Sequence, residues 1–263
     1  MPFLYSAVNL LTDSTLIDTS TEDPIYIDDY LYDSRPSRPF YFTAKAAQWV
    51  LIDLGAKTPV TLLACFNHNF KSAATGANLK IQANDNNIWG GGPGIPPVDL
   101  QMTWREFDFY RLFNEDRRWW RFYLEDATNP LFPRIGDLWL GAWSRFTGAH
   151  VQPVREDAPE VFAVEQVTPY GQDWDAYLST SKRFRISIVN INDPAVVDQF
   201  ETFIDAVGGP AGRWVFIPDS TKPHVYMVKI VGNPTAIRPI YGTKELREWS
   251  FELKVLTRGI TLL

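Results

Sequence analysis

Hydrophobic and polar residues alternate with a period of two in several short stretches of the chain, which predicts strands. Residues 48–55 (QWVLIDLG) are apolar on both faces of an extended chain, so we expect a central strand covered on both sides and ended by Gly55 and Thr58-Pro59. Residues 118–124, 183–189 and 249–255 alternate more cleanly, with one apolar face each. Further strands are expected at 60–66, 78–83, 135–140, 162–167, 213–217 and 224–231, and an aromatic turn at 170–177.

One stretch has the helical spacing instead. Asp193 is placed to cap a helix whose first position is Pro194, and apolar residues recur three or four positions apart as far as Val207. Gly208 and Gly209 then end the pattern. The sequence therefore predicts one helix at about 194–207.

The apolar rhythm is lost between residues 141 and 160, where Gly, Pro and charged residues accumulate, and it restarts afterwards. We therefore expect two domains: a β-sandwich over residues 1–145, and a second β-sandwich or barrel with one packed helix over 146–263. The chain of 263 residues is 45% hydrophobic with ten Trp, enough for two cores, and nineteen Pro and sixteen Gly favour strands and turns over long helices. The predicted fold class is mainly β.

Charge and cysteine content narrow the function classes. The net charge is −6 without a block of like charge, so no nucleic-acid groove is expected. The single cysteine, Cys65, excludes an intrachain disulfide and is expected to be a buried apolar residue. The N-terminal residues lack the features of a signal peptide, and no apolar run reaches the length that spans a membrane, so we expect a soluble protein made in a cytoplasm.

The usual signatures of catalysis and metal binding are missing, so we predict no enzyme activity, no catalytic residue, no cofactor and no metal. His68 lies near Cys65, but two ligands do not make a zinc site, and a structural histidine at a strand end is the favoured interpretation. Asp28, Asp29 and Asp33 have oxygens that Ca²⁺ accepts, without the pattern of a calcium loop. Adjacent acidic residues on a strand point to opposite faces, so their adjacency is no evidence for a shared site. They are expected to be solvated, because Asp and Glu are mostly exposed.

Two tryptophans are poorly explained by strand burial. Trp89 lies in the Gly-rich stretch 84–97, and Trp104 stands beside Arg105. Aromatic side chains on loops suit sugar or protein surfaces, and the alternative is that they anchor their loops by burial.

The first half resembles the discoidin-like (galactose-binding-like) jelly-roll family over residues 7–142. The resemblance is carried, in order, by NLL, DSRPSRPF, QWVLIDLG, FNHNF, LKIQAND, RRWWRFYLED and IGDLWLG. It implies a jelly-roll sandwich that binds ligands at loops on one end. The terminal disulfide of many secreted members is absent here, which argues against an extracellular animal-type module.

The second half resembles the distal-tail or minor tail proteins of long-tailed phages, through PYGQDWDAYL, ISIVNINDP, AGRWVFIPDSTKPHVYMVKIVGNP and YGTKELREWSFELKVLTRGI. This resemblance implies a non-enzymatic virion component at the tail tip or baseplate. Such a subunit would form a homo-oligomeric ring, with a hexamer favoured over a trimer, between the tail tube and hub proteins. Strand edges at 184–189 and 249–255 are the expected ring contacts.

The outward sandwich would then meet a host-surface glycan, for which the sequence nominates Arg35, Arg38, Trp89 and Trp104, since guanidinium groups and indole rings suit sugars. The alternative function is a free carbohydrate-binding lectin or an accessory module of a polysaccharide-degrading enzyme. A glycosidase using two of the paired carboxylates is the third hypothesis, and nothing in the sequence brings two of them to the required separation.

Overall fold

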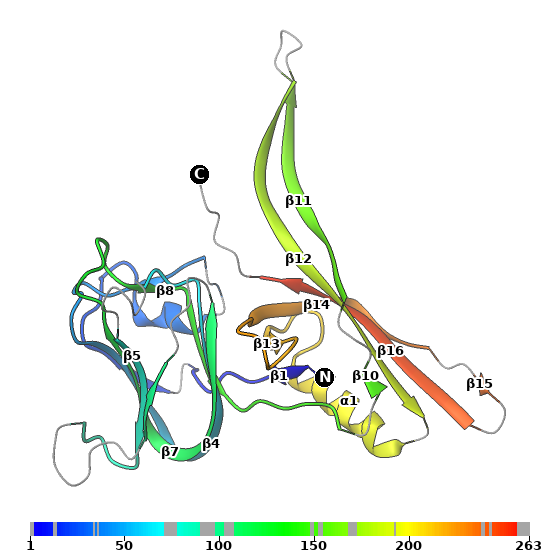
Figure 1. Cartoon of the computed structure of the whole chain (residues 1–263), viewed down its shortest axis with the longest axis horizontal. Helices are drawn as coiled ribbons and strands as arrows, with labels where there is room; N and C mark the ends of the chain where they lie inside the picture. The colour runs from blue at the N-terminus through cyan, green and yellow to red at the C-terminus, as the bar shows by residue number, and fades with distance from the viewer. Residues whose placement is uncertain are drawn as a thin grey trace. The chain divides into compact units, whose positions relative to one another are not determined.

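The protein forms two compact units, seen in a computed structural model (Figure 1). The sandwich unit comprises Tyr5–Ser144 with Ser220–Val225, and the helix unit comprises Met1–Leu4, Arg145–Asp219 and Tyr226–Leu263. The structure describes residues 3–12, 15–33, 35, 37–70, 78–89, 98–102, 108–147, 150–151, 155–167, 173–191, 193–237, 240–241 and 244–256.

The sandwich unit is built on a six-stranded antiparallel sheet in the order β2-β4-β7-β5-β6, with β9 also paired to β4. A short pair, β3 with β8, and one 3-10 turn, η1, complete it. The elements are β2 (Leu16–Thr19), η1 (Asp28–Leu31), β3 (Phe40–Tyr41), β4 (Gln48–Phe66), β5 (Asn78–Asn84), β6 (Val98–Gln101), β7 (Phe109–Glu125), β8 (Arg134–Ile135) and β9 (Asp137–Gly141).

Strands β4 and β7 are long and curved, and they run through both layers of the sandwich (Figure 1). Their pairing shifts register between Asp53 and Thr58, where Gly55 has a φ of 76° that L side chains rarely adopt. Before the shift β4 pairs with β2, and after it β4 pairs with β9. One strand pair therefore supplies the middle of both layers, β2-β4-β7-β5-β6 and β9-β4-β7.

This continuity corrects the expectation that Gly55 and Thr58-Pro59 end the strand. The chain stays in one strand from Gln48 to Phe66, so the two predicted strands 48–54 and 60–66 are halves of β4. Glycine signals an irregularity in a strand as readily as its end, and only the pairing of β4 with β7 on both sides of Gly55 decides between them.

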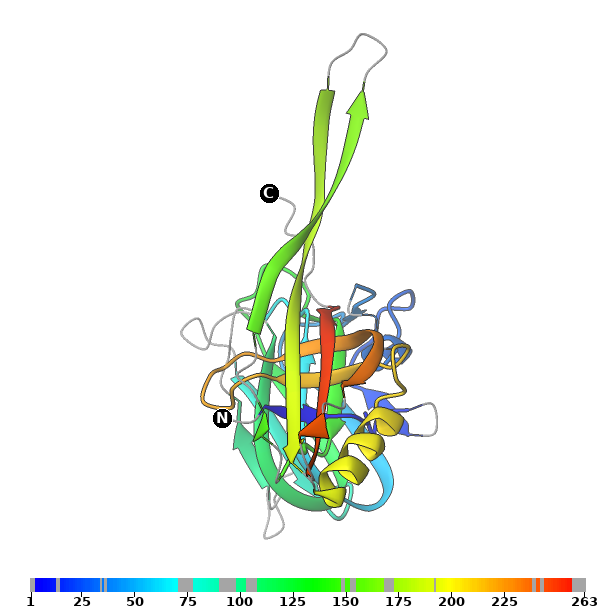
Figure 2. The same cartoon turned by 90° about the vertical axis from the view of Figure 1, so that its right-hand side faces the viewer.

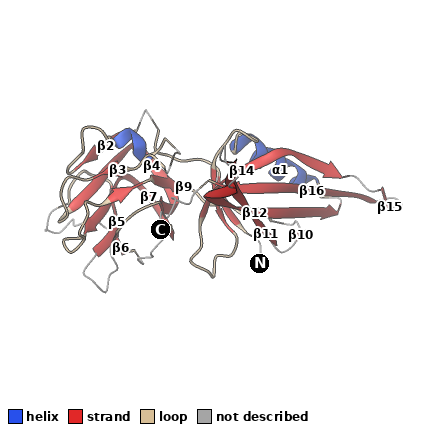
Figure 3. Ribbon diagram, turned by 90° about the horizontal axis from the view of Figure 1, so that it is seen from above, coloured by secondary structure: helices blue, strands red, loops and turns tan. Residues whose placement is uncertain are grey.

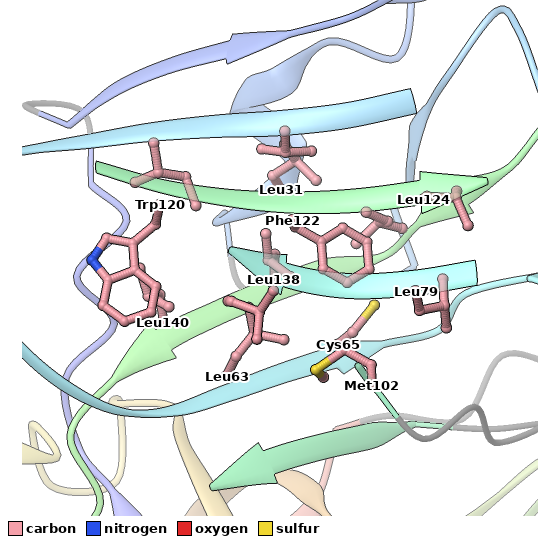
Figure 4. Close-up of a cluster of buried hydrophobic side chains, with 14 of the residues drawn as sticks. Leu31, Leu63, Cys65, Leu79, Met102, Trp120, Phe122, Leu124, Leu138 and Leu140 are labelled. Atoms are coloured by element: carbon pink, nitrogen blue, oxygen red, sulfur yellow. The ribbon is translucent and has the colours of Figure 1, made fainter. Parts of the chain in front are cut away.

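The core of the sandwich unit lies between its two layers. One cluster of buried side chains combines Val50 and Ile52, from before the bend in β4, with Leu63 and Cys65, from after it. Figure 4 shows the side chains of β4, β5, β7 and β9 converging on this space. Its labelled members are Leu31, Leu63, Cys65, Leu79, Met102, Trp120, Phe122, Leu124, Leu138 and Leu140.

The helix unit contains an eight-stranded sheet in the order β1-β13-β14-β16-β12-β10, with β11 also on β12 and β15 on β16. Its single α-helix among the described residues is α1 (Pro194–Ala206), capped by the Asp193 side chain. The strands of this sheet are β1 (Leu4–Ser6), of which only Leu4 is assigned to the helix unit, β10 (His150–Val151), β11 (Arg155–Val167), β12 (Asp173–Ile191), β13 (Trp214–Ile217), β14 (Tyr226–Ile237), β15 (Ile240–Tyr241) and β16 (Lys244–Val255).

Helix α1 lies against the sheet of the helix unit (Figure 3). Aromatic contacts hold it there. Phe200 stacks on Trp249 with ring centroids 4.7 Å apart, and Phe203 meets Trp214 edge-on at 5.2 Å. The alternation predicted for 183–189 and 249–255 is confirmed, since Phe184, Ile186 and Ile188 are buried together with the Trp249 face of β16. The predicted fold class, mainly β with a jelly-roll sandwich and a second β unit carrying one helix, is confirmed.

Strands β11 and β12 form a ribbon that projects from the sheet of the helix unit (Figures 1 and 2). From Asp173 to Ser181, β12 pairs with β11 and with no other described strand, whereas from Arg183 onward it also pairs with β16. The turn expected at 170–177 is therefore wrong for Asp173 to Tyr177, which are in β12, and residues 170–172 lie outside the described part.

Candidate functional site

The face of β4, β5 and β7 that points away from the core of the sandwich unit carries aromatic and charged side chains. Trp49 of β4 lies opposite Tyr123 of β7, which lies opposite Lys80 of β5. The neighbouring row sets Arg121 opposite Gln82. We define the outer face by Trp49, Lys80, Gln82, Trp119, Arg121 and Tyr123; all except Gln82 are half-buried.

Trp89 joins this face through a folded loop. Asn84, at the end of β5, accepts hydrogen bonds from the backbone N–H groups of Asp85 and Asn86 and donates to the Ile88 carbonyl at 2.9 Å. This turn brings the Trp89 ring to 4.6 Å from the Arg121 guanidinium. The loop anchors itself on the sheet, so Trp89 is half-buried rather than stranded in solvent.

Arg121 lies at the centre of the outer face. Its Nε donates to Gln82 Oε1 at 2.8 Å, and its guanidinium lies 5.6 Å from the Tyr123 ring as well as over Trp89. Gln82 in turn donates to Asp99 at 3.3 Å, and Lys80 binds the other oxygen of Asp99 at 3.1 Å. Burial lowers the pKa of the Arg121 guanidinium from its usual value, while the electrostatic effects of Tyr123 and Asp99 act to raise it.

Other cations around this surface have carboxylate partners. Lys57 and Arg117 both reach Asp85, at 2.8 and 3.0 Å. Arg118 forms a two-pronged contact with Asp53, whose oxygens accept from Nε and Nη2 at 2.7 Å each. In the described part of the chain, Arg121 has no carboxylate within ion-pair distance.

The Asp53–Arg118 pair stabilises the bend of β4. Asp53 also accepts from the backbone N–H of Gly55 at 2.8 Å, so one carboxylate bridges the bend and β7. The hydrogen bonds from Arg118 hold the pKa of the Asp53 carboxyl below its usual value, although burial works in the opposite direction. Both oxygens are therefore committed to structure.

The arginines nominated from the sequence lie on a different loop from Trp89. Arg38 is exposed, lies over the Tyr30 ring at 4.2 Å and forms an ion pair with Asp33 at 3.7 Å. Arg35 is exposed, and its backbone N–H donates to the Asp33 side chain. Trp89 instead contacts Arg121 and Asn87, and among the described residues no recorded contact joins it to Arg35 or Arg38. Trp104 lies outside the described residues.

Cys65 and His68 have reactive side chains, but both are buried and packed as structural residues. Burial raises the pKa of the Cys65 thiol well above its usual value, with Asp108 and Asp137 adding to the effect, so the thiol stays protonated and is a poor nucleophile. His68 is buried, stacks on Phe70 and accepts that residue's backbone N–H at Nδ1. These environments agree with the structural interpretation of both residues.

The described residues contain neither a cluster of metal ligands nor a helix that could span a membrane. No three His, Cys, Asp or Glu residues in that part are grouped so that they could hold a metal ion. Asp28 and Asp29 begin η1, where burial and then Asp29 raise the pKa of Asp28. None of the described helices is long and apolar enough to cross a bilayer.

A pocket of about 390 Å³ lies between the N-terminal segment and the bend of β4. Its two most polar residues are already occupied: Asn9 bonds to the backbone of Leu138 and Leu140, and Asp53 binds Arg118. The outer face is the stronger candidate site, because its polar side chains lie beside aromatic side chains that are partly exposed to solvent.

Sequence reasoning nominated none of the six residues that define the outer face, although a signal for three of them was present. In RWWRFYL, the period of two places Trp119, Arg121 and Tyr123 on one side and Trp120, Phe122 and Leu124 on the other. The first set is polar and aromatic, which is typical of an outward face. The alternation could not show that Trp89 folds onto this set. Trp89 lies just after β5, whereas Arg121, which its ring contacts, is in β7, much later in the sequence.

Comparisons with known proteins identify no family for this chain. No family model matches it. No curated protein matches it at the threshold of significance.

Several solved structures that resemble about half of the chain are described as carbohydrate-binding domains. Chitosan-binding module 1 from a chitosanase/glucanase of Paenibacillus sp. IK-5 has a TM-score of 0.41 and 12% identity, covering 51% of this chain and 99% of that one. The family 32 CBM from C. perfringens NanJ, in complex with galactose, has a TM-score of 0.39 and 15% identity, covering 49% and 93%. The lectin domain of Lectinolysin, complexed with Lewis B antigen, has a TM-score of 0.40 and 10% identity, covering 51% and 96%. Likenesses of this strength assign neither a family nor a ligand to this chain.

Proposed function

We propose that the sandwich unit binds glycans through its outer face, without catalysing a reaction. The supporting observation is a group of half-buried aromatic side chains on the solvent side of a sheet, Trp49, Trp119, Tyr123 and Trp89, around a fixed polar network. Solvent faces of antiparallel sheets are ordinarily polar. A sugar ring offers C–H groups on its faces and hydroxyls around its rim, which suits aromatic rings bordered by amide, ammonium and guanidinium donors.

The test is a glycan array followed by titration calorimetry on the glycans that bind. Replacing Trp119 and Tyr123 together by alanine is expected to weaken binding by about 10-fold or more, because each ring contributes roughly 1 kcal/mol beyond its buried area. Failure of the unaltered protein to bind any glycan would overturn the proposal.

Two control variants separate the outer face from the loops. Phe132→Ala removes an aromatic side chain that is 50% exposed on the loop between β7 and β8, and binding should persist. Arg38→Ala tests the loop nominated from the sequence, for which Arg35 and Arg38 remain predictions. Loss of binding in Arg38→Ala, with binding intact in the Trp119/Tyr123 variant, would move the site to that loop.

A second candidate function is the ring subunit of a phage tail inferred from the sequence, located in the virion and in contact with tube and hub proteins. The ribbon of β11 and β12 favours it, because a two-stranded ribbon alone is marginally stable in water and gains from a partner strand. The comparisons lend this candidate no support.

Light scattering after size exclusion tests this second candidate. The full chain is expected to form a closed oligomer, whereas a variant with residues 160–181 replaced by an Asn-Gly turn should be monomeric and keep its glycan affinity. A monomeric full chain at high concentration, absent from purified phage particles by mass spectrometry, would remove it.

A further inference from the structure

Among the described residues, Arg121 differs from the other cations around the outer face, because none of their carboxylates pairs with it. Lys57, Lys80, Arg117 and Arg118 each have a carboxylate oxygen within 3.1 Å. Within the described residues, Arg121 has instead one hydrogen bond to a neutral amide and the faces of two aromatic rings. The outer face therefore holds one uncompensated positive charge at its centre.

A half-buried, uncompensated charge costs free energy that a bound anion would recover. Stacking on Trp89 offsets part of that cost, since an arginine over an indole ring is attracted by the ring's quadrupole. This contact with the ring uses none of the hydrogen-bonding capacity of the Arg121 guanidinium. In the described part of the structure only Nε is bonded, so both terminal nitrogens remain available as donors.

The guanidinium is also oriented before any ligand arrives. Gln82 holds its Nε end at 2.8 Å, and Asp99 holds Gln82 in turn. The Trp89 ring fixes the plane from one side. A planar pair of donors in a fixed position matches two oxygens of a carboxylate or a phosphate, and little side-chain entropy is lost when such a contact forms.

We propose that Arg121 makes the outer face selective for sugars that carry an anionic group, either a carboxylate or a phosphate. This inference rests on the proposed glycan binding and adds the chemical class of the ligand. The neighbouring carboxylate, Asp99, does not compete for the site, because Lys80 and Gln82 already bind its two oxygens.

The experiment compares matched sugars on the full chain. Disaccharides ending in galactose, glucose or N-acetylglucosamine are each titrated as the neutral sugar, as the uronate and as the 6-phosphate. We expect an anionic form to bind about 10-fold to 100-fold more tightly than its neutral counterpart, the effect of charge-assisted hydrogen bonds. The preferred form, uronate or phosphate, identifies the source of the anion. Raising the salt concentration should reduce this preference.

Substitutions assign the preference to one side chain. In Arg121→Gln the ratio of anionic to neutral affinity should fall to about one, and in Arg121→Lys it should fall partly, because an ammonium keeps the charge and loses the planar fork. Lys57→Gln is the matched control: it removes one positive charge nearby, from a residue outside the outer face, and should keep the ratio. Thermal unfolding establishes that each variant is folded, and Arg121→Lys provides the test where Arg121→Gln does not fold.

The outcomes separate the two proposals. Equal affinity for neutral and anionic sugars would overturn the role of Arg121 and leave glycan binding in place. An anionic preference that survives in both Arg121 variants would also overturn it. Absence of binding to every sugar in the set and on the array would overturn the proposed function itself.

Discussion

The two faces of β7 carry neighbouring residues with opposite tasks. Trp120 and Phe122 point inward and are fully buried, whereas Trp119 and Arg121 point outward and are half-buried. Trp120 and Phe122 fill space in the core, where the Trp120 indole also donates to the Arg117 carbonyl at 3.1 Å. On the outward side, Arg121 donates to Gln82 at 2.8 Å. A single strand thus combines packing with the proposed recognition, and only the period of two separates them.

This difference separates the residues that stabilise the sandwich unit from those that we propose bind a ligand. Burial of large apolar side chains stabilises the fold, and a substitution there is expected to act on unfolding. On the outward side the large side chains are only partly removed from water, so a substitution should cost less stability and act mainly on ligand binding. Substitutions on either face, or at the bend that both layers share, test whether stability and ligand binding depend on different residues.

The largest effect is expected from Trp120→Ala. It empties a site with no exposed surface between the two layers and should lower the free energy of unfolding by about 3–5 kcal/mol. Urea denaturation followed by fluorescence measures it. A loss below about 1 kcal/mol would mean that the inner face is not the core we describe.

Asp53→Asn should cost less, near the lower end of about 1.5–3 kcal/mol, the range for hydrogen bonds to charged groups. The side chain of Arg118 is 42% exposed, so water replaces part of what the substitution removes. The measurement is the urea midpoint of variant and parent at pH 7. Arg38→Ala is the control, since its pair with Asp33 is a surface contact at 3.7 Å and should contribute little.

Gly55→Ala should destabilise the sandwich unit by about 1–2 kcal/mol, the cost of a left-handed backbone for an L side chain. No atom lies within 4 Å of an added Cβ, so backbone strain is the only cost. An unchanged thermal midpoint in Gly55→Ala would show that β4 relaxes at its bend without loss.

Trp119→Ala should change stability by about 1 kcal/mol or less, because the ring is half-buried and its contact with Arg118 lies on the surface. It differs from Trp120→Ala only in which face of the strand loses an indole. Comparable destabilisation by the two substitutions would abolish the distinction between the faces.

The smallest effect is the dependence on pH. The pKa of Asp53 is lowered in the folded state, so its contribution to stability is complete above the unfolded pKa and is lost as pH falls through the lower folded value. The difference in stability between parent and Asp53→Asn should therefore shrink below about pH 4. Urea midpoints between pH 7 and pH 2.5 measure it, and a difference that stays constant over this range would contradict the assignment.

Local patterns in the sequence predicted much of the fold. The spacing from Pro194 onward indicated α1, and alternation separated the buried side of 183–189 and 249–255 from the exposed side. Each of these signals depends on residues a few positions apart. The strand boundary at Gly55 was wrong, because whether a glycine ends a strand or bends it depends on a partner strand about sixty residues away in the sequence.

The sequence by itself determined the class of fold, the position of the helix and the inward set of apolar residues, since burial of a periodic apolar face is decided by local order along the chain. Tertiary structure alone decided that β4 and β7 run through both layers, that the Trp89 loop folds over β7, and that no carboxylate of the described residues pairs with Arg121. Which charges pair depends on register and loop closure, and these follow from the packing of distant segments rather than from the pattern of any one of them.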